Sequence, residues 1–237
     1  MVKLFVNGAW RAVKIDDYLP INKSGNWLCA YSDKGKLWVS LLEKAYLKVC
    51  GGYEAGGSNS SKDLYVFTGW LPEQYDMAKE GFDPEALWKR INRGYATNDA
   101  LITIGTGMLK EGHTENGLVP LHSYGVLEIV EIEDNRLLLL KNPWGHYCWR
   151  GKFSFDDEIS WTPSLKKALG YDNFSKDKGV FWIDWDSIVR WFDHLDINWN
   201  PDALQYQKSF FDIWKADTML TGDTFSIKDN PQFCIDF

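Results

Sequence analysis

Two apolar runs joined by a short polar segment constrain the fold of this chain more than any other feature. Residues 125–132 and 137–140 are rich in Val, Ile and Leu, and residues 133–136 between them are all polar. This pattern predicts a strand, a turn and a second strand. An antiparallel return brings the far end of the second strand back to the start of the first. The hairpin therefore places Asn142 near His122.

A histidine beside an asparagine indicates proton-transfer chemistry. An imidazole can take a proton from a nucleophile and return it to a leaving group, provided that something fixes its tautomer and orientation. The side-chain oxygen of Asn142 can do this for His122 without adding charge, as in Cys-His-Asn triads. Trp144 lies two residues further on and could shield that hydrogen bond from water. On spacing alone, an ordinary strand histidine and an ordinary Asn-Pro-Trp-Gly turn are the favoured explanation, because a lone His and Asn are weak evidence.

Several segments resemble one protein family, both in their residues and in their order along the chain. Gly-Leu-Val-Pro-Leu-His-Ser-Tyr-Gly-Val-Leu (117–127) and Leu-Lys-Asn-Pro-Trp-Gly (140–145) resemble the histidine and asparagine blocks of the calpain-type cysteine peptidases, most of all the calpain-7 branch. Further blocks resemble the second half of the first protease subdomain, the junction to the second subdomain, and a late core strand: residues 15–20 with 37–46, 67–70 and 179–183. The resemblance covers roughly residues 4–200.

The resemblance implies a papain-like protease core and an intracellular endopeptidase that cleaves proteins at limited sites. It makes His122 the general base, Asn142 its orienter and Trp144 a supporting shield. In this family the catalytic cysteine, with the glutamine of the oxyanion hole, precedes the block that begins here at Ile15. We therefore expect this chain to lack the nucleophile and to be inactive alone. The alternative is a non-catalytic, protein-binding calpain-like module or pseudo-protease.

None of the four cysteines is a good replacement for the nucleophile. A catalytic cysteine needs a lowered pKa, usually from a helix N-terminus and a neighbouring imidazolium. Cys50 lies at the C-terminal end of a predicted helix, and Cys29 lies in a strand-like apolar segment. Cys148 follows the histidine, which reverses the family's order, and Cys234 lies in the tail. We interpret all four as structural or incidental.

The pattern along the chain predicts an α+β fold in three zones. Residues 1–69 correspond to the C-terminal, helical part of the first protease subdomain. Residues 70–200 correspond to the antiparallel, β-rich second subdomain with His122 and Asn142. Residues 201–237 are expected to hold only the start of a C2-like β-sandwich, which the Asn-Pro-Gln-Phe at 230–233 resembles. The predicted partners are protein substrates, the missing half of the protease core, or further C-terminal domains.

Local patterns predict the elements within these zones. Short strands are expected at residues 3–6, 11–15 and 27–31, and residues 56–61 read as a surface loop. A helix over residues 37–49 has one apolar stripe, interpreted as core, and ends at Gly51 and Gly52. Further helices and strands are predicted at segments with clear caps or apolar runs: a helix after Asp83-Pro84, a strand at 100–104, a helix after Thr162-Pro163, a strand at 180–183, and a helix after Asp184.

Calcium is possible by family resemblance, so we compared the residues at its expected site. In the family, two acidic ligands flank the glycine before the Phe-Trp strand, but these positions are Lys178 and Val180 here. Calcium needs six to eight oxygen ligands. Asp156, Asp157 and Glu158 remain as weak metal candidates, and three adjacent acids are more often a solvated loop. We predict no tight calcium site and no other cofactor.

Charge and composition exclude several other classes. The formal net charge of −7 and the lack of a basic stripe oppose nucleic-acid binding. No apolar run reaches the roughly 18 residues of a membrane span, and the N-terminus is too short for a signal-peptide core. Four irregularly spaced cysteines form neither a disulfide scaffold nor a zinc motif. We therefore expect a cytoplasmic protein. One local departure is Leu121, where many relatives have Gly and where a larger side chain is expected to narrow access to His122.

Overall fold

The computed structural model describes residues 1–32, 34–54, 56–108, 116–145, 147–171 and 179–212. Met1–Leu204 forms one compact unit, and Gln205–Phe237 forms a second. Residues 205–212 have no regular secondary structure, and residues 230–233, the expected start of a β-sandwich, lie outside the described residues. In the part of the chain that is described, no helix is long and apolar enough to cross a membrane.

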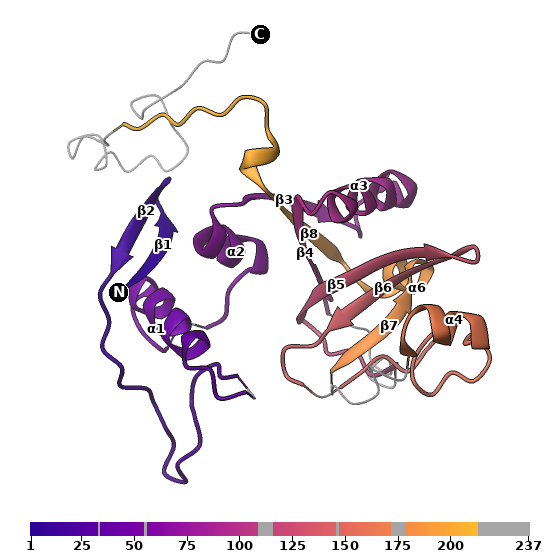
Figure 1. Ribbon diagram of the computed structural model, residues 1–237, viewed down its shortest axis with the longest axis horizontal. Helices are drawn as coiled ribbons and strands as arrows, with labels where there is room; N and C mark the ends of the chain where they lie inside the picture. The colour runs from indigo at the N-terminus through magenta and orange to yellow at the C-terminus, as the bar shows by residue number, and fades with distance from the viewer. Residues whose placement is uncertain (33, 55, 109–115, 146, 172–178, 213–237) are drawn as a thin grey trace. The chain divides into compact units, whose positions relative to one another are not determined.

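The first unit contains a six-stranded antiparallel sheet (Figure 1). The strand order is β3-β8-β4-β5-β6-β7, so strands far apart in sequence are neighbours in the sheet. Its strands are β3 (Leu71–Asp76), β4 (Ala100–Gly105), β5 (Ser123–Ile132), β6 (Asn135–Lys141), β7 (Val180–Asp184) and β8 (His194–Trp199). With the helices around it, the sheet makes a mixed α+β fold of the predicted class.

The predicted hairpin is formed by β5 and β6. Pairing runs from Gly125 opposite Lys141 to Ile132 opposite Asn135, with a register shift between Val126 and Glu128. The turn is shorter than predicted, because only Glu133 and Asp134 lie outside the strands. Both have positive φ, 47° and 62°, which is the backbone of the tight turns that match the twist of paired strands.

One face of the sheet is covered by two helices. Helix α3 (Pro84–Ala96) begins as predicted, because one oxygen of Asp83 accepts the backbone N–H groups of Glu85 and Ala86 at 3.0 Å each. Helix α6 (Trp185–Trp191) is capped in the same way by Asp184. The apolar side chains of both helices pack with those of the sheet into the largest core cluster, which includes Leu87, Trp88, Ile91, Ile104, Tyr124, Leu140, Phe181, Ile188 and Leu195.

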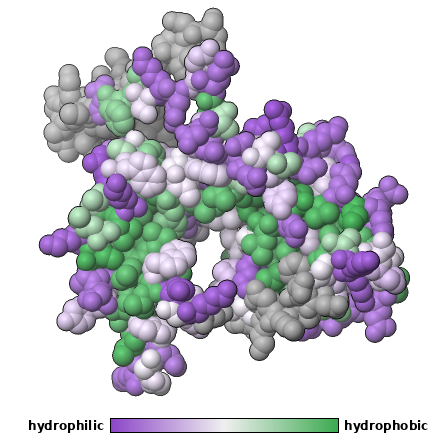
Figure 2. All heavy atoms as spheres, in the orientation of Figure 1, coloured by the Kyte–Doolittle hydropathy of each residue, from purple (hydrophilic) through white to green (hydrophobic). Residues whose placement is uncertain are grey.

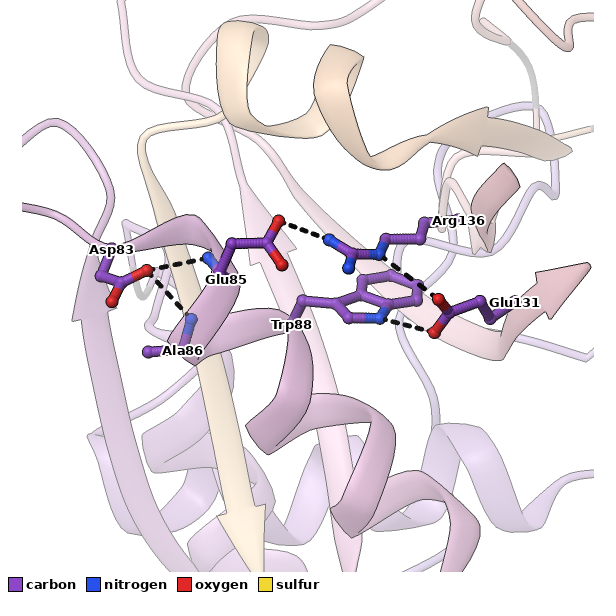
Figure 3. A network of polar contacts seen from close by, with 6 residues as sticks. All are labelled: Asp83, Glu85, Ala86, Trp88, Glu131 and Arg136. Atoms are coloured by element: carbon purple, nitrogen blue, oxygen red, sulfur yellow. Dashed lines mark hydrogen bonds and ion pairs between the residues drawn. The ribbon is translucent and has the colours of Figure 1, made fainter. Parts of the chain in front are cut away.

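A polar network fastens α3 to the tip of the hairpin (Figure 3). The guanidinium of Arg136 bonds to Glu85 at 2.5 Å and lies 5.4 Å from the ring centroid of Trp88. The indole Nε1–H of Trp88 donates to Glu131 at 3.2 Å, and Glu131 is also 3.7 Å from Arg136 Nε. The tip is therefore held to the helix by charge and by the flat face of one indole.

The opposite face of the sheet has two different coverings. At the β6–β7 side, α4 (Pro163–Ala168) and its flanking loop bury Phe153, Trp161 and Leu165 against Leu137, Leu139, Val180 and Trp182. At the β3–β8–β4 side lies α2 (Ser60–Thr68), whose contacts with the sheet are polar. The fully buried carboxylate of Asp196 accepts hydrogen bonds from Ser60 Oγ at 3.1 Å and Gln74 Nε2 at 3.0 Å.

The N-terminal elements are β1 (Val2–Val6), β2 (Ala9–Val13) and α1 (Trp38–Cys50). Helix α1 ends at Gly51 in the left-handed conformation, as predicted. The interpretation of its apolar stripe as core is wrong at both ends, whereas Ala45 in the middle is completely buried. Leu37, Trp38 and Val49 are 58%, 64% and 46% exposed, because no described element packs over them. Figure 2 shows hydrophobic side chains at the surface of these elements.

Two other local predictions are also wrong. Residues 27–31 do not form a strand, because the N–H of Ala30 bonds to the Glu43 carboxylate and its carbonyl accepts from Ser40 Oγ. Residues 56–61 are not all loop, because α2 begins at Ser60 and is capped by Asn59, whose side chain accepts from Lys62 N–H. In both cases a side chain forms the hydrogen bond to a backbone group, and the sequence pattern did not predict that bond.

Candidate active site

The hairpin brings the two predicted residues together. His122 immediately precedes β5 and Asn142 immediately follows β6, so both lie at the open end of the hairpin. His122 Nε2 is 2.9 Å from Asn142 Oδ1. The asparagine side chain is completely buried, whereas the histidine is partly exposed. The proximity expected from the sequence is therefore found, with one partner in the protein interior and the other reachable from solvent.

The hydrogen bonds of Asn142 decide which way its amide faces. Its Nδ2 donates to the carbonyl of Tyr147 at 3.0 Å, and its Oδ1 accepts the backbone N–H of Trp144 at 3.0 Å. The Oδ1 atom can only accept, so Nε2 of His122 carries the proton in their shared bond. In the neutral ring, Nδ1 is then the nitrogen with a free lone pair. The arrangement presents Nδ1 as the proton acceptor.

Aromatic rings surround the imidazole. The ring of Trp144 lies 4.4 Å from that of His122 between centroids, at an interplanar angle of 48°. Trp144 is 54% exposed, so it covers part of the imidazole from solvent and is itself open on its other side. The buried ring of Tyr124 meets His122 edge to face at 5.0 Å. Burial raises the pKa of the Tyr124 hydroxyl to about 12, so this phenol adds no charge beside the imidazole at neutral pH.

Sequence reasoning missed two residues of this site, Thr106 and Tyr124. Thr106 is buried just after β4 and bonds to both main-chain groups of His122. The hydroxyl of Tyr124 accepts the N–H of Val119 at 2.8 Å. A signal for Thr106 was present in the sequence, because a lone hydroxyl residue stands between Gly105 and Gly107 at the end of an apolar strand.

No cysteine sulfur among the described residues hydrogen-bonds to the His122 ring. Cys50 is exposed and is the last residue of α1, at the negative end of the helix dipole. Cys29 and Cys148 are partly buried, and Cys148 packs against the main core cluster. Cys234 lies outside the described residues. Of the described cysteines, Cys50 therefore has a position opposite to that expected of a nucleophile, at the C-terminal end of its helix.

Leu121 has an unusual backbone conformation beside the site. Its φ is 49°, in the left-handed region that favours glycine, and its side chain is 71% exposed. A glycine would adopt this conformation without the steric penalty of a side chain. That the leucine side chain narrows access to the imidazole of His122 stays a prediction.

The residues at the expected calcium position do not fit that ion. Val180 is buried in the apolar cluster with Trp161 and Trp182, and Lys178 lies outside the described residues. Asp156 and Glu158 are exposed. No group of three or more His, Cys, Asp or Glu side chains in the described ranges is arranged to hold a metal. The absence of a tight calcium site stays a prediction.

Asp157 has a structural role in the same loop. Burial acts to raise the pKa of its carboxyl, but hydrogen bonds from the Ser160 side chain and from the N–H groups of Ser160, Phe153 and Ile159 outweigh it. Together they hold the pKa of Asp157 at about 2. Its oxygens thus close the loop between Phe153 and Ser160.

Residues 1–198 match the model of the family described as calpain family cysteine protease. The chain belongs to this family. It is 42% identical to calpain-7 of Sus scrofa and of Homo sapiens over 240 residues, which is 98% of this chain and 30% of each relative. It is 37% identical to the calpain-like protease palB/RIM13 of Aspergillus oryzae over 236 residues, 98% of this chain and 27% of the relative. This calpain-family chain thus spans about a third of the length of these relatives.

Proposed function

We propose that this chain supplies the histidine and asparagine of a calpain-type cysteine endopeptidase that cleaves protein substrates at limited sites. His122 is the general base, Asn142 orients it and Trp144 shields their bond. The observation that carries the proposal is the 2.9 Å contact from His122 Nε2 to Asn142 Oδ1, with the amide orientation fixed by two further hydrogen bonds.

The geometry gives each residue a definite step. Nδ1 of His122 takes the proton of a cysteine thiol, and the thiolate attacks the substrate carbonyl. The imidazolium then returns that proton to the leaving amine. Throughout, Asn142 Oδ1 accepts the hydrogen bond from Nε2–H and keeps Nδ1 of the ring facing the thiol. The cysteine itself comes from a polypeptide segment outside residues 15–200.

The surface of the N-terminal part supports a partner of this kind. Large apolar side chains are exposed there, and they include Trp10, Tyr18, Ile21, Trp27, Leu28, Tyr31, Leu37 and Trp38. Exposed apolar groups gathered in one part of a chain indicate an interaction surface. We place the boundaries of the family's parts at 1–69, 70–200 and 201–237, and we assign the cysteine-bearing segment to the surface of the first part.

A complementation assay tests this function. The chain is combined with the cysteine-bearing segment of a calpain-7 relative, and casein cleavage is measured with and without iodoacetamide. We expect thiol-dependent cleavage, with kcat lowered by about 10²–10⁴ in His122→Ala because the general base is lost. Asn142→Ala lowers kcat as well, while Asn135→Ala, a control at the hairpin tip, does not. Thiol-dependent cleavage by the chain alone would contradict the proposal that another segment supplies the cysteine.

A non-catalytic binding module is the second candidate. It is favoured by the same exposed apolar side chains, and by the lack of a cysteine bonded to His122 among the described residues. Calorimetry with the cysteine-bearing segment separates the two functions. Both predict binding that Trp38→Asp weakens, but a binding module shows no cleavage in the complemented sample. Binding without iodoacetamide-sensitive cleavage would therefore favour this second function.

A further inference from the structure

The loop that carries His122 is fastened to one threonine. The backbone N–H of Thr106 donates to the carbonyl of His122 at 3.0 Å. Thr106 Oγ1 accepts the N–H of His122 at 3.1 Å and donates to the carbonyl of Val119 at 2.6 Å. Its side chain is almost completely buried. One residue therefore satisfies both main-chain groups of the proposed base.

His122 needs such a partner because it lies beyond the regular sheet. The last pair between β4 and β5 is Gly105 opposite Ser123, so His122 has no partner in the strand ladder. Unpaired main-chain groups in a partly buried loop are costly, and they leave the backbone free to rotate. Without Thr106, both main-chain groups of His122 would lose the hydrogen bonds that they make in this structure.

Thr106 is itself held on both sides. The carbonyl of Gly105 accepts the N–H of Asp193 at 3.0 Å, and the carbonyl of Gly107 accepts the N–H of Leu121 at 3.0 Å. A Cβ on Gly107 would lie 1.6 Å from Asp193 Oδ2, so the two segments are in the closest contact that glycine allows. Residues 105–107 are thus fixed between the start of β8 and the His122 loop.

Tyr124 ties the other end of the same loop. Its hydroxyl accepts the N–H of Val119, the residue whose carbonyl accepts from Thr106. Both main-chain groups of Val119 are therefore bonded to buried hydroxyls, three residues before His122. The loop is therefore hydrogen-bonded at Val119, at Leu121 and at His122.

We propose that Thr106 is a positioning residue whose hydroxyl sets the orientation of the His122 ring toward Asn142. This inference rests on the proposed role of His122 as the base. Because the hydroxyl bonds to the loop at both Val119 and His122, its removal frees two main-chain groups at once. The ring then moves relative to Asn142 Oδ1, and the preference for the Nε2–H tautomer weakens.

Long-range ¹H–¹⁵N spectra of the histidine-labelled chain test the proposal. The His122 signals are assigned from their loss in His122→Gln. We expect the Nε2–H tautomer to dominate in the unmodified chain. In Thr106→Val the tautomer ratio shifts about fivefold toward Nδ1–H, the equivalent of one hydrogen bond. Thr106→Ser keeps the hydroxyl and is expected to retain the original ratio.

Two further variants keep the test decisive. Ile102→Val lowers the stability of β4 without touching the loop and should leave the ratio unchanged. Tyr124→Phe removes one hydrogen bond to Val119 and gives a smaller shift in the same direction, which serves if Thr106→Val does not fold. An unchanged ratio in folded Thr106→Val, or an equal shift in Thr106→Ser or Ile102→Val, would overturn the proposal. The measurement needs no turnover, so a failure of the cleavage assay is distinguishable from a failure here.

Discussion

The ring of His194 lies directly over Gly105, so that a Cβ on Gly105 would stand 2.1 Å from His194 Cε1. Gly105→Ala is therefore expected to destabilise the fold by about 1–3 kcal/mol, because the histidine ring or the strand must move. Urea unfolding measures this. Gly125→Ala, on the neighbouring strand, is the matched control, since its Cβ would meet nothing within 4 Å. His194→Ala should restore stability to the Gly105→Ala chain. Equal stabilities of the two alanine variants would contradict the close packing.

Leu121→Gly is expected to stabilise the chain by up to about 1 kcal/mol, because glycine adopts a positive φ without the steric penalty of a side chain. The comparison variant is Leu127→Gly, an exposed leucine inside β5, where glycine should instead destabilise. Thermal unfolding of both variants shows whether each substitution raises or lowers the stability. A loss of stability in both would show that Leu121 gains more from its contacts than it loses in backbone strain.

The contribution of the polar network in Figure 3 to the stability of the fold should come mainly from the indole of Trp88. Trp88→Ala is expected to cost about 3–5 kcal/mol, since the side chain is buried in the main core cluster. Arg136→Gln should cost much less, because its ion pairs with Glu85 and Glu131 are solvent-exposed and weak. The difference between Arg136→Gln and the unmodified chain should shrink as sodium chloride is raised. A difference that does not respond to salt would assign the effect to packing on Trp88.

Asp157 gives the chain a pH-dependent contribution to stability. Its folded pKa of about 2 is below the ordinary value of 3.8, so the unfolded chain binds more protons between these values. The contribution is complete above about pH 4 and is lost as the pH falls toward 2. Asp157→Asn should remove this part of the acid dependence, whereas Asp156→Asn, with its exposed side chain, should not. Unfolding midpoints measured from pH 5 to pH 2 test this, and identical profiles for the two variants would contradict it.

Local patterns were sufficient where one segment determines its own structure. The hairpin, the Asp83 and Asp184 caps and the Gly51 helix end all depend on residues within a few positions of each other, and all are found. The proximity of His122 and Asn142 follows from the hairpin alone. The roles proposed for the two residues then follow from their side chains, because an imidazole can accept a proton and an amide oxygen can orient it.

Long-range contacts explain what the patterns missed. Strands β3 and β8 pair across more than a hundred residues. Residues 194–199 alternate between polar and apolar, but residues 71–76 do not, so the sequence of β3 gives no clear strand signal. The contact of Asp196 with Ser60 and Gln74 is polar, so no hydrophobic pattern in the sequence could predict it. The stripe of α1 was misinterpreted because periodicity gives the direction of an apolar face, but not whether anything covers it.

The register shift between Val126 and Glu128 has a consequence for how this region can change during evolution. Val126 pairs with Leu140 and Glu128 with Leu139, so Leu127 is the extra residue of β5. Loss of Leu127 alone would leave the pairs on both sides of the shift unchanged, whereas a slip of the register would move each following side chain to the other face of the sheet. The position at which β5 can lose one residue without moving Tyr124 and His122 is therefore Leu127.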